Sequence, residues 1–250
     1  YVDAYQKALF SAPDALEFRT KLLNIFATDA AKIWIEAKQI EERFKSIKIE
    51  NIQTPPPTMV AVDLSVRDDF SSVTYNLYSK TTGSFHSVTD YYLPEGTLFN
   101  HPNRELYRGW ADAGYLQLCE GSIINYQQIA DDILRRAAYL RILGIGYDPY
   151  KSAEFVNIIS SAIGSSDDYI KPIKQTYGTF TSPVESFEIA LYRDKLTFDP
   201  NPITPYCFSN AVLDEDRLGN KKPIKRLQNG KIDSTITNLM TFYLFNNLEN

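Results

Sequence analysis

Three aspartates stand at positions that a fold could bring together as ligands for divalent metal ions. Asp63 lies within an apolar run, residues 59–66, directly after the triple proline at 55–57. The run is typical of a buried strand, and a carboxylate there must be paired, hydrogen-bonded or bound to metal to offset its desolvation. Asp148 ends a second apolar run, and Asp233 opens the last apolar helix. A metal site from these residues would therefore join a strand, a strand end and a helix start.

The chemistry open to these acids is hydrolysis of a phosphodiester with two metal ions. Mg²⁺ and Mn²⁺ prefer carboxylate oxygens and keep several of their waters. Two such ions about 4 Å apart can activate a water on one side of the phosphorus and stabilise the leaving oxygen on the other. Three aspartates supply the charge for two ions, and Asp68 and Asp69, just after the first strand, are candidates for a fourth ligand.

Each acid also has a structural interpretation, which the sequence leaves open. Asp63 could bond to nearby backbone amides, and Asp69 fits a surface turn. Asp148 precedes a proline, as turn-starting aspartates do, and Asp233 suits a helix N-cap. The metal hypothesis depends on all of these acids falling where one fold brings them together.

A basic segment without acids lies just before Asp233. The net charge of the chain is −5, so the overall charge gives no support for nucleic-acid binding, and only this local segment does. The segment could grip phosphates beside the carboxylates, or it could be a solvated surface loop. Its basic residues are Lys221, Lys222, Lys225, Arg226 and Lys231.

The sequence lacks motifs for several other kinds of chemistry. There is no G-x-x-x-x-G-K-[ST] segment for ATP phosphates, and the two histidines, His86 and His101, lack the spacing of a zinc site. Cys119 and Cys207 form no spacing motif and are typical of buried free thiols in a reducing compartment. No apolar stretch approaches the ~20 residues needed to cross a bilayer. We therefore expect no ATP site and no membrane association.

The order of the expected elements predicts the fold class. A turn at 81–83 indicates that the first three strands form an antiparallel meander. The order predicts an α/β fold: an RNase H-like mixed five-stranded sheet with three antiparallel strands, two parallel strands and helices on both faces. In such a sheet the first and fourth strands are neighbours, which would place Asp63 beside Asp148. The expected strands are 60–66, 72–79, 84–93, 142–147 and 169–175, and the expected helices are 104–113, 126–140, 151–163, 183–195 and 234–248.

Residues 1–56 are expected to form a separate helical arm or linker. The triple proline at 55–57 cannot lie inside a helix and makes a stiff, extended joint. The remaining residues, 57–250, are enough for one domain with a sizeable core. We therefore predict a domain boundary at residue 57.

Taken together, the segments of residues 57–246 resemble the C-terminal nuclease domain of the large terminase subunit of tailed bacteriophages and prophages. The segments before the triple proline are similar to the end of that family's ATPase domain and the linker that follows it. The agreement runs in the right order through Val62-Asp63-Leu64-Ser65, Asp69-Phe70-Ser71-Ser72, Tyr91-Tyr92-Leu93-Pro94-Glu95-Gly96, Tyr107-Arg108-Gly109-Trp110, Glu120-Gly121-Ser122-Ile123-Ile124-Asn125-Tyr126, Gly146-Tyr147-Asp148, Ser209-Asn210-Ala211-Val212 and Lys231-Ile232-Asp233.

The resemblance implies a metal-dependent endonuclease that cuts concatemeric double-stranded phage DNA during genome packaging, in the cytoplasm of the bacterial host. The family's metal-binding acids correspond to Asp63, Asp148 and Asp233, and its basic segment corresponds to residues 221–231. The expected cofactors are two Mg²⁺ or Mn²⁺ ions. The partners that the resemblance implies are the terminase ATPase domain, the small terminase subunit and the portal.

Two other functions stay open at this point. The 17 tyrosines are typical of protein interfaces, so the domain could be a non-catalytic module that docks onto DNA or the portal. It could also be another RNase H-like enzyme, such as a junction resolvase or a transposase. Metal-dependent cleavage would exclude the first alternative, and a preference for branched junctions would favour the second.

Overall fold

The structure is a computed structural model that describes residues 33–67, 69–99, 101–150, 152–164, 169–227 and 229–248. The residues from Trp34 onward form one compact unit. Most of the expected N-terminal arm, residues 1–32, lies outside the described residues.

The compact unit begins earlier than the boundary expected at residue 57. Ile35 and Ile40 are fully buried in its core, and Ile40 belongs to the short helix α3 (Ala37–Glu41). The backbone at Phe44 forms a parallel bridge with Phe198. The triple proline is therefore a bend within the unit, because the apolar residues before it are buried together with those that follow it. A 3₁₀ helix, η2 (Ile49–Asn51), precedes the bend.

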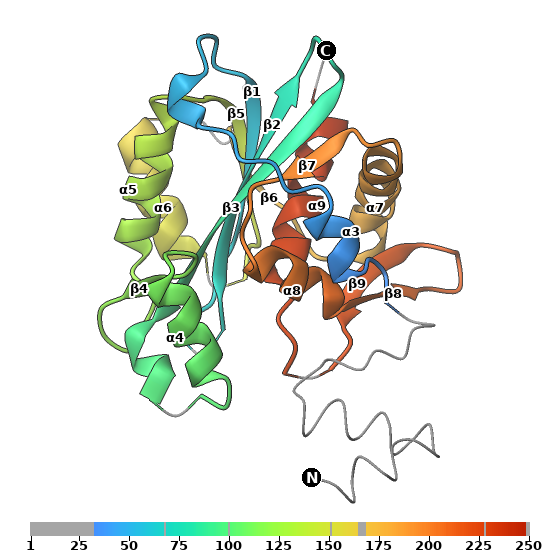
Figure 1. The fold of residues 1–250 in the computed structure, drawn as a ribbon. Coiled ribbons are helices and arrows are strands. Elements are labelled where there is room, and N and C mark those ends of the chain that lie inside the picture. Colours follow the sequence, from blue (N-terminus) through green and yellow to red (C-terminus); the bar gives the residue numbers. More distant parts are fainter. Residues whose placement is uncertain are drawn as a thin grey trace, which may run out of the picture. The chain divides into compact units, whose positions relative to one another are not determined.

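A mixed sheet forms the centre of the unit (Figure 1). Its order is β4-β3-β2-β1-β5-β6, in which β1 pairs antiparallel with β2 and parallel with β5. The five expected strands are all present, and two short ones, β4 and β7, pair in parallel with the two ends of β3. The strands are β1 (Pro57–Asp63), β2 (Ser71–Ser79), β3 (Ser84–Pro94), β4 (Gln117–Cys119), β5 (Arg141–Tyr147), β6 (Ile170–Pro172) and β7 (Leu196–Phe198).

Helices cover both faces of the sheet, as expected (Figure 1). On one face, the α5 and α6 side chains share a buried cluster with Val60 and Val62 of β1. On the other face, the α7, α8 and α9 side chains share a cluster with Met59 and Ala61. Because successive side chains of a strand point to opposite faces, Asp63 follows Met59 and Ala61 toward α9. The helices are α5 (Tyr126–Ala137), α6 (Ala153–Ile163), α7 (Tyr177–Tyr192), α8 (Ile203–Ser209) and α9 (Asp233–Asn246).

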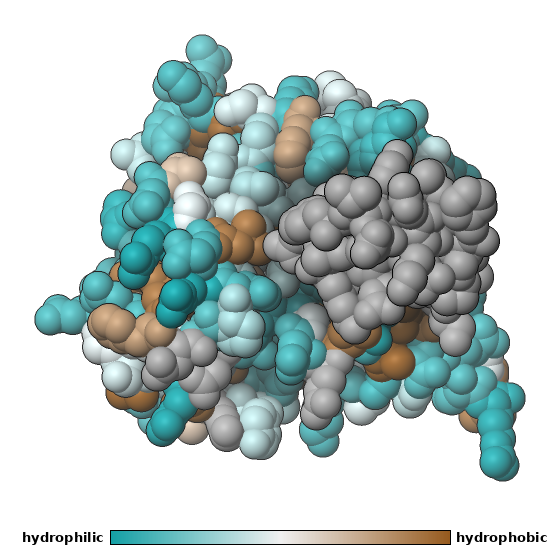
Figure 2. Space-filling model, turned by 60° about the horizontal axis from the view of Figure 1, so that its bottom comes forward, coloured by the Kyte–Doolittle hydropathy of each residue, from teal (hydrophilic) through white to brown (hydrophobic). Residues whose placement is uncertain are grey.

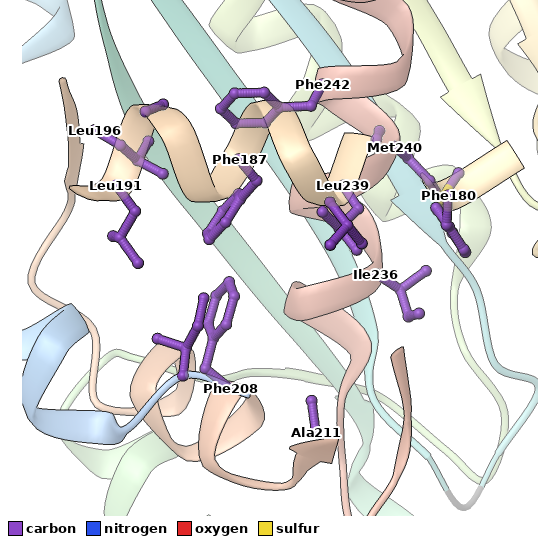
Figure 3. Close-up of a cluster of buried hydrophobic side chains, with 14 of the residues drawn as sticks. Phe180, Phe187, Leu191, Leu196, Phe208, Ala211, Ile236, Leu239, Met240 and Phe242 are labelled. Carbon is purple, nitrogen blue, oxygen red and sulfur yellow. The ribbon is translucent and has the colours of Figure 1, made fainter. Parts of the chain in front are cut away.

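Aromatic packing holds the layer of α7, α8 and α9 together (Figure 3). Phe187 of α7 and Phe208 of α8 stack with ring centroids 5.3 Å apart. Phe242 of α9 meets Phe187 edge-on at 5.4 Å. This layer fixes α9, and thus Asp233 at its start, against the sheet.

The remaining elements flank the carboxyl end of β1. One group consists of η3 (Glu95–Phe99) and α4 (Arg104–Asp112); Leu98 of η3 shares a cluster with Phe70, and Tyr107 and Trp110 of α4 make ring contacts with it. The other is an antiparallel hairpin of β8 (Ala211–Glu215) and β9 (Lys221–Lys225), which carries most of the basic segment.

Several element boundaries differ by a few residues from those expected, among them the end of the first strand and the start of the helix that contains Pro183. The first strand ends at Asp63, which therefore lies at the strand terminus and not in its middle. The helix expected to begin at Pro183 begins six residues earlier, at Tyr177, where the Thr176 side chain accepts a hydrogen bond from Thr179 N as an N-cap. Proline is most common in the first turn of a helix, but here it lies inside one, so its position gave the wrong start.

Hydrophilic residues cover most of the described surface visible in Figure 2, and hydrophobic residues show there in separate patches. Among the described residues, no helix has the length and apolar character to cross a bilayer.

Candidate active site

Asp63 and Asp148 leave the sheet side by side, as the strand order predicts. Val62 is the register partner of Tyr147 in the parallel pair of β1 and β5, and Asp148 N lies 3.4 Å from Val62 O. Burial, followed by the nearby charges of Asp148 and Asp69, raises the pKa of Asp63 to about 7. A carboxyl group that is half protonated near neutral pH is one that a cation would stabilise.

Asp233 reaches the same place from the opposite layer. It is the first residue of α9, which packs across β1 and β2 on the face toward which Asp63 points. Ile232 holds the N-cap position, so the Asp233 carboxylate does not serve as the cap. The residue is 8% exposed, and its Oδ2 has no hydrogen-bond partner among the described residues. Burial raises the pKa of Asp233 well above its usual value, and the charges of Asp69 and Asp63 add to this.

Asp69 is the one acid of the group that is held by cations. Its Oδ1 lies 2.8 Å from Lys231 Nζ, and its Oδ2 accepts a hydrogen bond of 3.0 Å from Lys225 Nζ. Burial disfavours the ionised form, but the two lysines hold the pKa of Asp69 below its usual value. Both lysines therefore contact the same carboxylate.

These side chains line one cavity of about 460 Å³. Asp63, Asp69 and Asp233 all reach it. Asp148 does not line the cavity itself but is hydrogen-bonded to two residues that do. Its Oδ2 accepts a hydrogen bond from Gln175 Nε2, and its Oδ1 accepts one of 2.9 Å from Tyr150 N.

The carboxylates are the right type of ligand for a hard divalent ion, but their side chains are not arranged as a complete metal-binding group. Among the described residues, no three acidic, histidine or cysteine side chains form a closed metal-binding group. The unpartnered Oδ2 of Asp233 and the raised pKa of Asp63 both indicate uncompensated negative charge. Oxygen donors with excess negative charge are what Mg²⁺ and Mn²⁺ prefer, so the residues present fit these ions.

The structure divides the expected DNA-binding residues into two sets. Lys225 and Lys231 face the acids, and Lys231 is only 7% exposed, so the expectation that it contacts DNA from the surface is not supported. Lys221, Lys222 and Arg226 lie outside this cluster, on and beside the hairpin. Lys222 Nζ stands 4.5 Å from the centre of the Tyr177 ring.

Three further lining residues, Arg67, Tyr150 and Gln175, were not singled out from the sequence. Gln175 follows β6, which is parallel to β5. Because the carboxyl ends of parallel strands meet at one edge of a sheet, the end of the fifth expected strand was a usable signal for Gln175. No comparable signal marks Arg67 or Tyr150.

A second cavity, of about 620 Å³, lies at the opposite end of β1, between Pro57 and Arg141. Its lining includes Lys45, Lys80 and Arg141 and has no acidic residue among those described. This lining offers no carboxylate to a divalent cation, so the carboxylate cavity is the candidate active site.

The sheet order, the helices on both faces and the meeting of β1, β5 and α9 at one cavity define an RNase H-like fold of the nuclease type. The chain belongs to the family of the terminase large subunit, endonuclease domain, whose family model matches residues 3–249. The resemblance seen in the sequence is thereby confirmed.

Three relatives illustrate this membership. The protein YmfN of Escherichia coli (strain K12) is 23% identical over 262 residues, which cover 96% of this chain and 56% of YmfN. The crystal structure of the HK97 bacteriophage large terminase matches with a TM-score of 0.72 and 20% identity, over 97% of this chain and 49% of that one. The large terminase nuclease from thermophilic phage G20c with bound magnesium matches with a TM-score of 0.51 and 7% identity, over 84% and 97% of the two chains. The chain spans about half the length of YmfN and of the HK97 terminase.

Proposed function

We propose that this chain is a divalent-metal-dependent endonuclease that cleaves double-stranded phage DNA during genome packaging, by hydrolysis with two metal ions. The observation that carries the proposal is the excess of carboxylates over cations in one cavity. Asp63, Asp69 and Asp233 line it together with two cations, Lys225 and Arg67, and the charge of the nearby Asp148 adds to theirs at Asp63; the two lysines of the group, Lys225 and Lys231, both contact Asp69. Family membership and the magnesium in the G20c nuclease support the same function.

In this proposal Asp63, Asp148 and Asp233 hold the ions, and Asp69 is a further candidate ligand. Divalent ions at these acids would supply an activated water for attack on the phosphorus and stabilise the leaving oxygen. Gln175 and the backbone amide of Tyr150 each occupy one oxygen of Asp148 and so orient that carboxylate. Lys231, buried against Asp69, keeps that acid ionised and in place.

DNA binding is assigned to the cationic residues around the cavity. Lys221, Lys222 and Arg226 on and beside the hairpin would contact phosphates without reading sequence. Lys225 and Arg67 line the cavity itself and are nearer to the acids. Lys231 is excluded from this set by its burial.

The partners follow from the family and are part of the proposal. We infer that the domain works with a terminase ATPase domain, the small terminase subunit and the portal, in the cytoplasm of the bacterial host. Translocation of DNA would then belong to the ATPase domain, because we found no ATP-binding motif in this sequence.

The experiment that tests the proposal is cleavage of supercoiled plasmid by the purified chain with Mg²⁺, Mn²⁺ or EDTA. We expect nicked and linear products with either ion and none with EDTA. Asp148→Ala should abolish cleavage, and Asp112→Ala, which removes an exposed carboxylate at the end of α4, should leave it unchanged. Cleavage that survives in EDTA or in Asp148→Ala would refute the assigned chemistry.

A non-catalytic docking module is the second candidate function. It is favoured by the lack, among the described residues, of a closed group of three metal ligands. It predicts DNA or portal binding by a folded protein that cleaves under none of the conditions above. A third possibility, another RNase H-like enzyme such as a junction resolvase, predicts preferential cutting of branched DNA over plasmid.

A further inference from the structure

Helix α9 is buried on two sides that differ in chemistry. Its apolar side, with Leu239 and Met240, packs into the cluster shared with α7 and α8 (Figure 3). Its other side carries Thr237, Asn238 and Thr241, all fully buried, and faces strands β2 and β3. Burying polar groups is unfavourable unless they are hydrogen-bonded, so we expect the polar residues on this second side to have partners on the sheet.

The polar side of α9 meets a polar stripe of the sheet, and together they form what we call the hydroxyl seam. Thr237 Oγ1 lies 2.7 Å from Thr74 Oγ1, and Thr241 Oγ1 accepts a hydrogen bond of 3.0 Å from Asn76 Nδ2. Asn238 Oδ1 accepts one of 2.7 Å from Ser87 Oγ on β3. The seam therefore consists of Thr74, Asn76, Ser87, Thr237, Asn238 and Thr241.

The spacing of these contacts fixes where α9 sits along β2. Thr237 and Thr241 are four residues apart, about 6 Å along a helix. Their partners, Thr74 and Asn76, are two residues apart, about 6.7 Å along a strand. The two repeats match in the observed register, and a shift of α9 by a distance between these repeats would leave buried hydroxyl and amide groups unpaired, at about 1–3 kcal/mol each. Apolar packing alone is non-directional and sets no such register.

Thr237 links the seam to two acids of the active site, Asp63 and Asp233. Its Oγ1 lies 3.3 Å from Ser72 Oγ, and Ser72 is the register partner of Asp63 in the β1–β2 pair. The same Oγ1 lies 3.3 Å from the main-chain oxygen of Asp233, one turn back along the helix. A single buried hydroxyl thus stands between the strand pair that ends at Asp63 and the helical turn that begins at Asp233.

We propose that Thr237 is a positioning residue whose buried hydroxyl holds Asp233 at the distance from Asp63 that divalent metal binding requires. This inference rests on the proposed function, because it assigns these two acids to a metal site. It adds that the precision of the site depends on a hydroxyl that touches neither the metal nor the DNA. Loss of a group that orients metal ligands typically weakens metal binding 10- to 100-fold.

Three substitutions test the proposal, with Mn²⁺ affinity by isothermal titration calorimetry as the main readout and thermal unfolding in EDTA as the control for stability. Thr237→Val removes the hydroxyl at nearly constant shape and should weaken Mn²⁺ binding about tenfold. Thr237→Ser keeps the hydroxyl and should restore affinity to within about twofold of wild type. Thr241→Val is the matched control: it removes the same group one turn farther from Asp233, so it should lower the melting temperature similarly and leave Mn²⁺ affinity unchanged.

The possible outcomes separate the positioning role of Thr237 from the proposed metal site. Wild-type affinity in Thr237→Val, or an equal loss in Thr241→Val, would overturn the positioning role and leave the proposed nuclease intact. A wild-type protein that binds no Mn²⁺ would overturn the metal site and this inference together. If Thr237→Val does not fold, Ser72→Ala removes a partner of the same hydroxyl from the strand side, and unchanged affinity in that variant counts against the proposal.

Discussion

Two groups of buried carboxylates lie on opposite faces of the sheet, and their charges are balanced very differently. On the face covered by α5, Asp90 accepts two hydrogen bonds from Arg136, of 2.9 and 2.6 Å. Its neighbour Asp132 accepts a hydrogen bond of 2.9 Å from Tyr92 Oη and is paired with Arg135. Each acid of this group has its own arginine, so the group can be explained by structure alone.

On the face covered by α9, four carboxylates share two lysines, Lys225 and Lys231, and both lysines contact Asp69. The pKa of Asp63 and that of Asp233 are raised as a result of burial and of neighbouring negative charge. Uncompensated buried charge lowers stability and is retained where a ligand supplies the missing charge. The comparison therefore separates an acid cluster that serves folding from one that serves binding.

The largest difference should appear in activity. Asp63→Asn removes a proposed metal ligand, whose loss is worth several kcal/mol of transition-state stabilisation, so plasmid cleavage should fall about 1,000-fold. Initial nicking rates at saturating Mn²⁺ measure this. Asp194→Asn, at an exposed carboxylate paired with Arg43, is the control and should keep the wild-type rate. Cleavage within tenfold of wild type in Asp63→Asn would place the site elsewhere.

In the cluster where each acid has its own arginine, a substitution should lower stability and leave activity unchanged. Asp90→Asn leaves Arg136 buried without its carboxylate, so the free energy of unfolding in urea should fall by about 3 kcal/mol. The cleavage rate per folded molecule should not change. Adding Arg136→Met removes the orphaned charge and should recover part of the lost stability. If Asp90→Asn lowered cleavage without lowering stability, the two clusters would not differ in the way proposed.

The pH dependence of stability should next report the charge on Asp63. The raised pKa of Asp63, about 7, means that the folded protein keeps a proton which the unfolded chain releases near pH 4. Without metal, this group therefore lowers stability progressively as pH rises from about 4 to about 7. Relative to Asp63→Asn in EDTA, the wild type should lose about 2 kcal/mol between pH 4.5 and pH 8, less than the full linkage value because Asp63 is partly exposed. A constant difference in the free energy of unfolding between the two proteins across this range would show that folding does not raise the pKa of Asp63.

A smaller effect is expected from the group that orients Asp148. Gln175→Ala removes the amide that donates to Asp148 Oδ2, so Mn²⁺ affinity should weaken about tenfold. Asn220→Ala is a matched control, since Asn220 Nδ2 donates to the carboxylate of Asp216 in the hairpin turn, away from the cavity. Equal affinities for Gln175→Ala and wild type would mean that Asp148 needs no such support or holds no metal.

The smallest effect should come from the hairpin lysines. Replacing both Lys221 and Lys222 with Gln should weaken DNA binding at low salt and reduce the slope of log affinity against log salt by about 1.8. Fluorescence anisotropy with a DNA duplex in Ca²⁺, at several salt concentrations, measures the slope. Lys38 and Lys48, replaced together in the same way, are the control. An unchanged slope in the hairpin variant would place the DNA path elsewhere.

Much of the site could be predicted because it depends on local patterns. An apolar run that contains an acid or ends in one indicates a buried strand that carries this acid, and the chain order indicates which strands are neighbours. Asp63 and Asp148 were placed side by side on this basis, and their strands are indeed paired. Asp233, expected at a helix start, is the first residue of α9.

Other features could not be read from the sequence, because they depend on contacts between distant segments. Lys231 looked like one member of a surface basic run, but it is buried against Asp69, which lies far from it in the sequence. Within the same basic run, Lys225 contacts Asp69 at the cavity and Lys222 lies over the Tyr177 ring at the hairpin, although both residues are lysines. Thr237 and Thr241 are polar residues in a helix, and their full burial depends on the polar residues of the strands packed against them.

The sequence by itself determined the order of strands and helices, the family, and the edge of the sheet at which the acids gather. The element order and the sheet edge follow from periodicity and from residue type, which act over a few residues at a time, and the family follows from the resemblance of ordered motifs along residues 57–246. The tertiary structure alone decided which cations meet which acids and which polar side of α9 is buried. Those outcomes depend on desolvation and on hydrogen bonds that only the packed layers create, across separations of more than 150 residues in the chain.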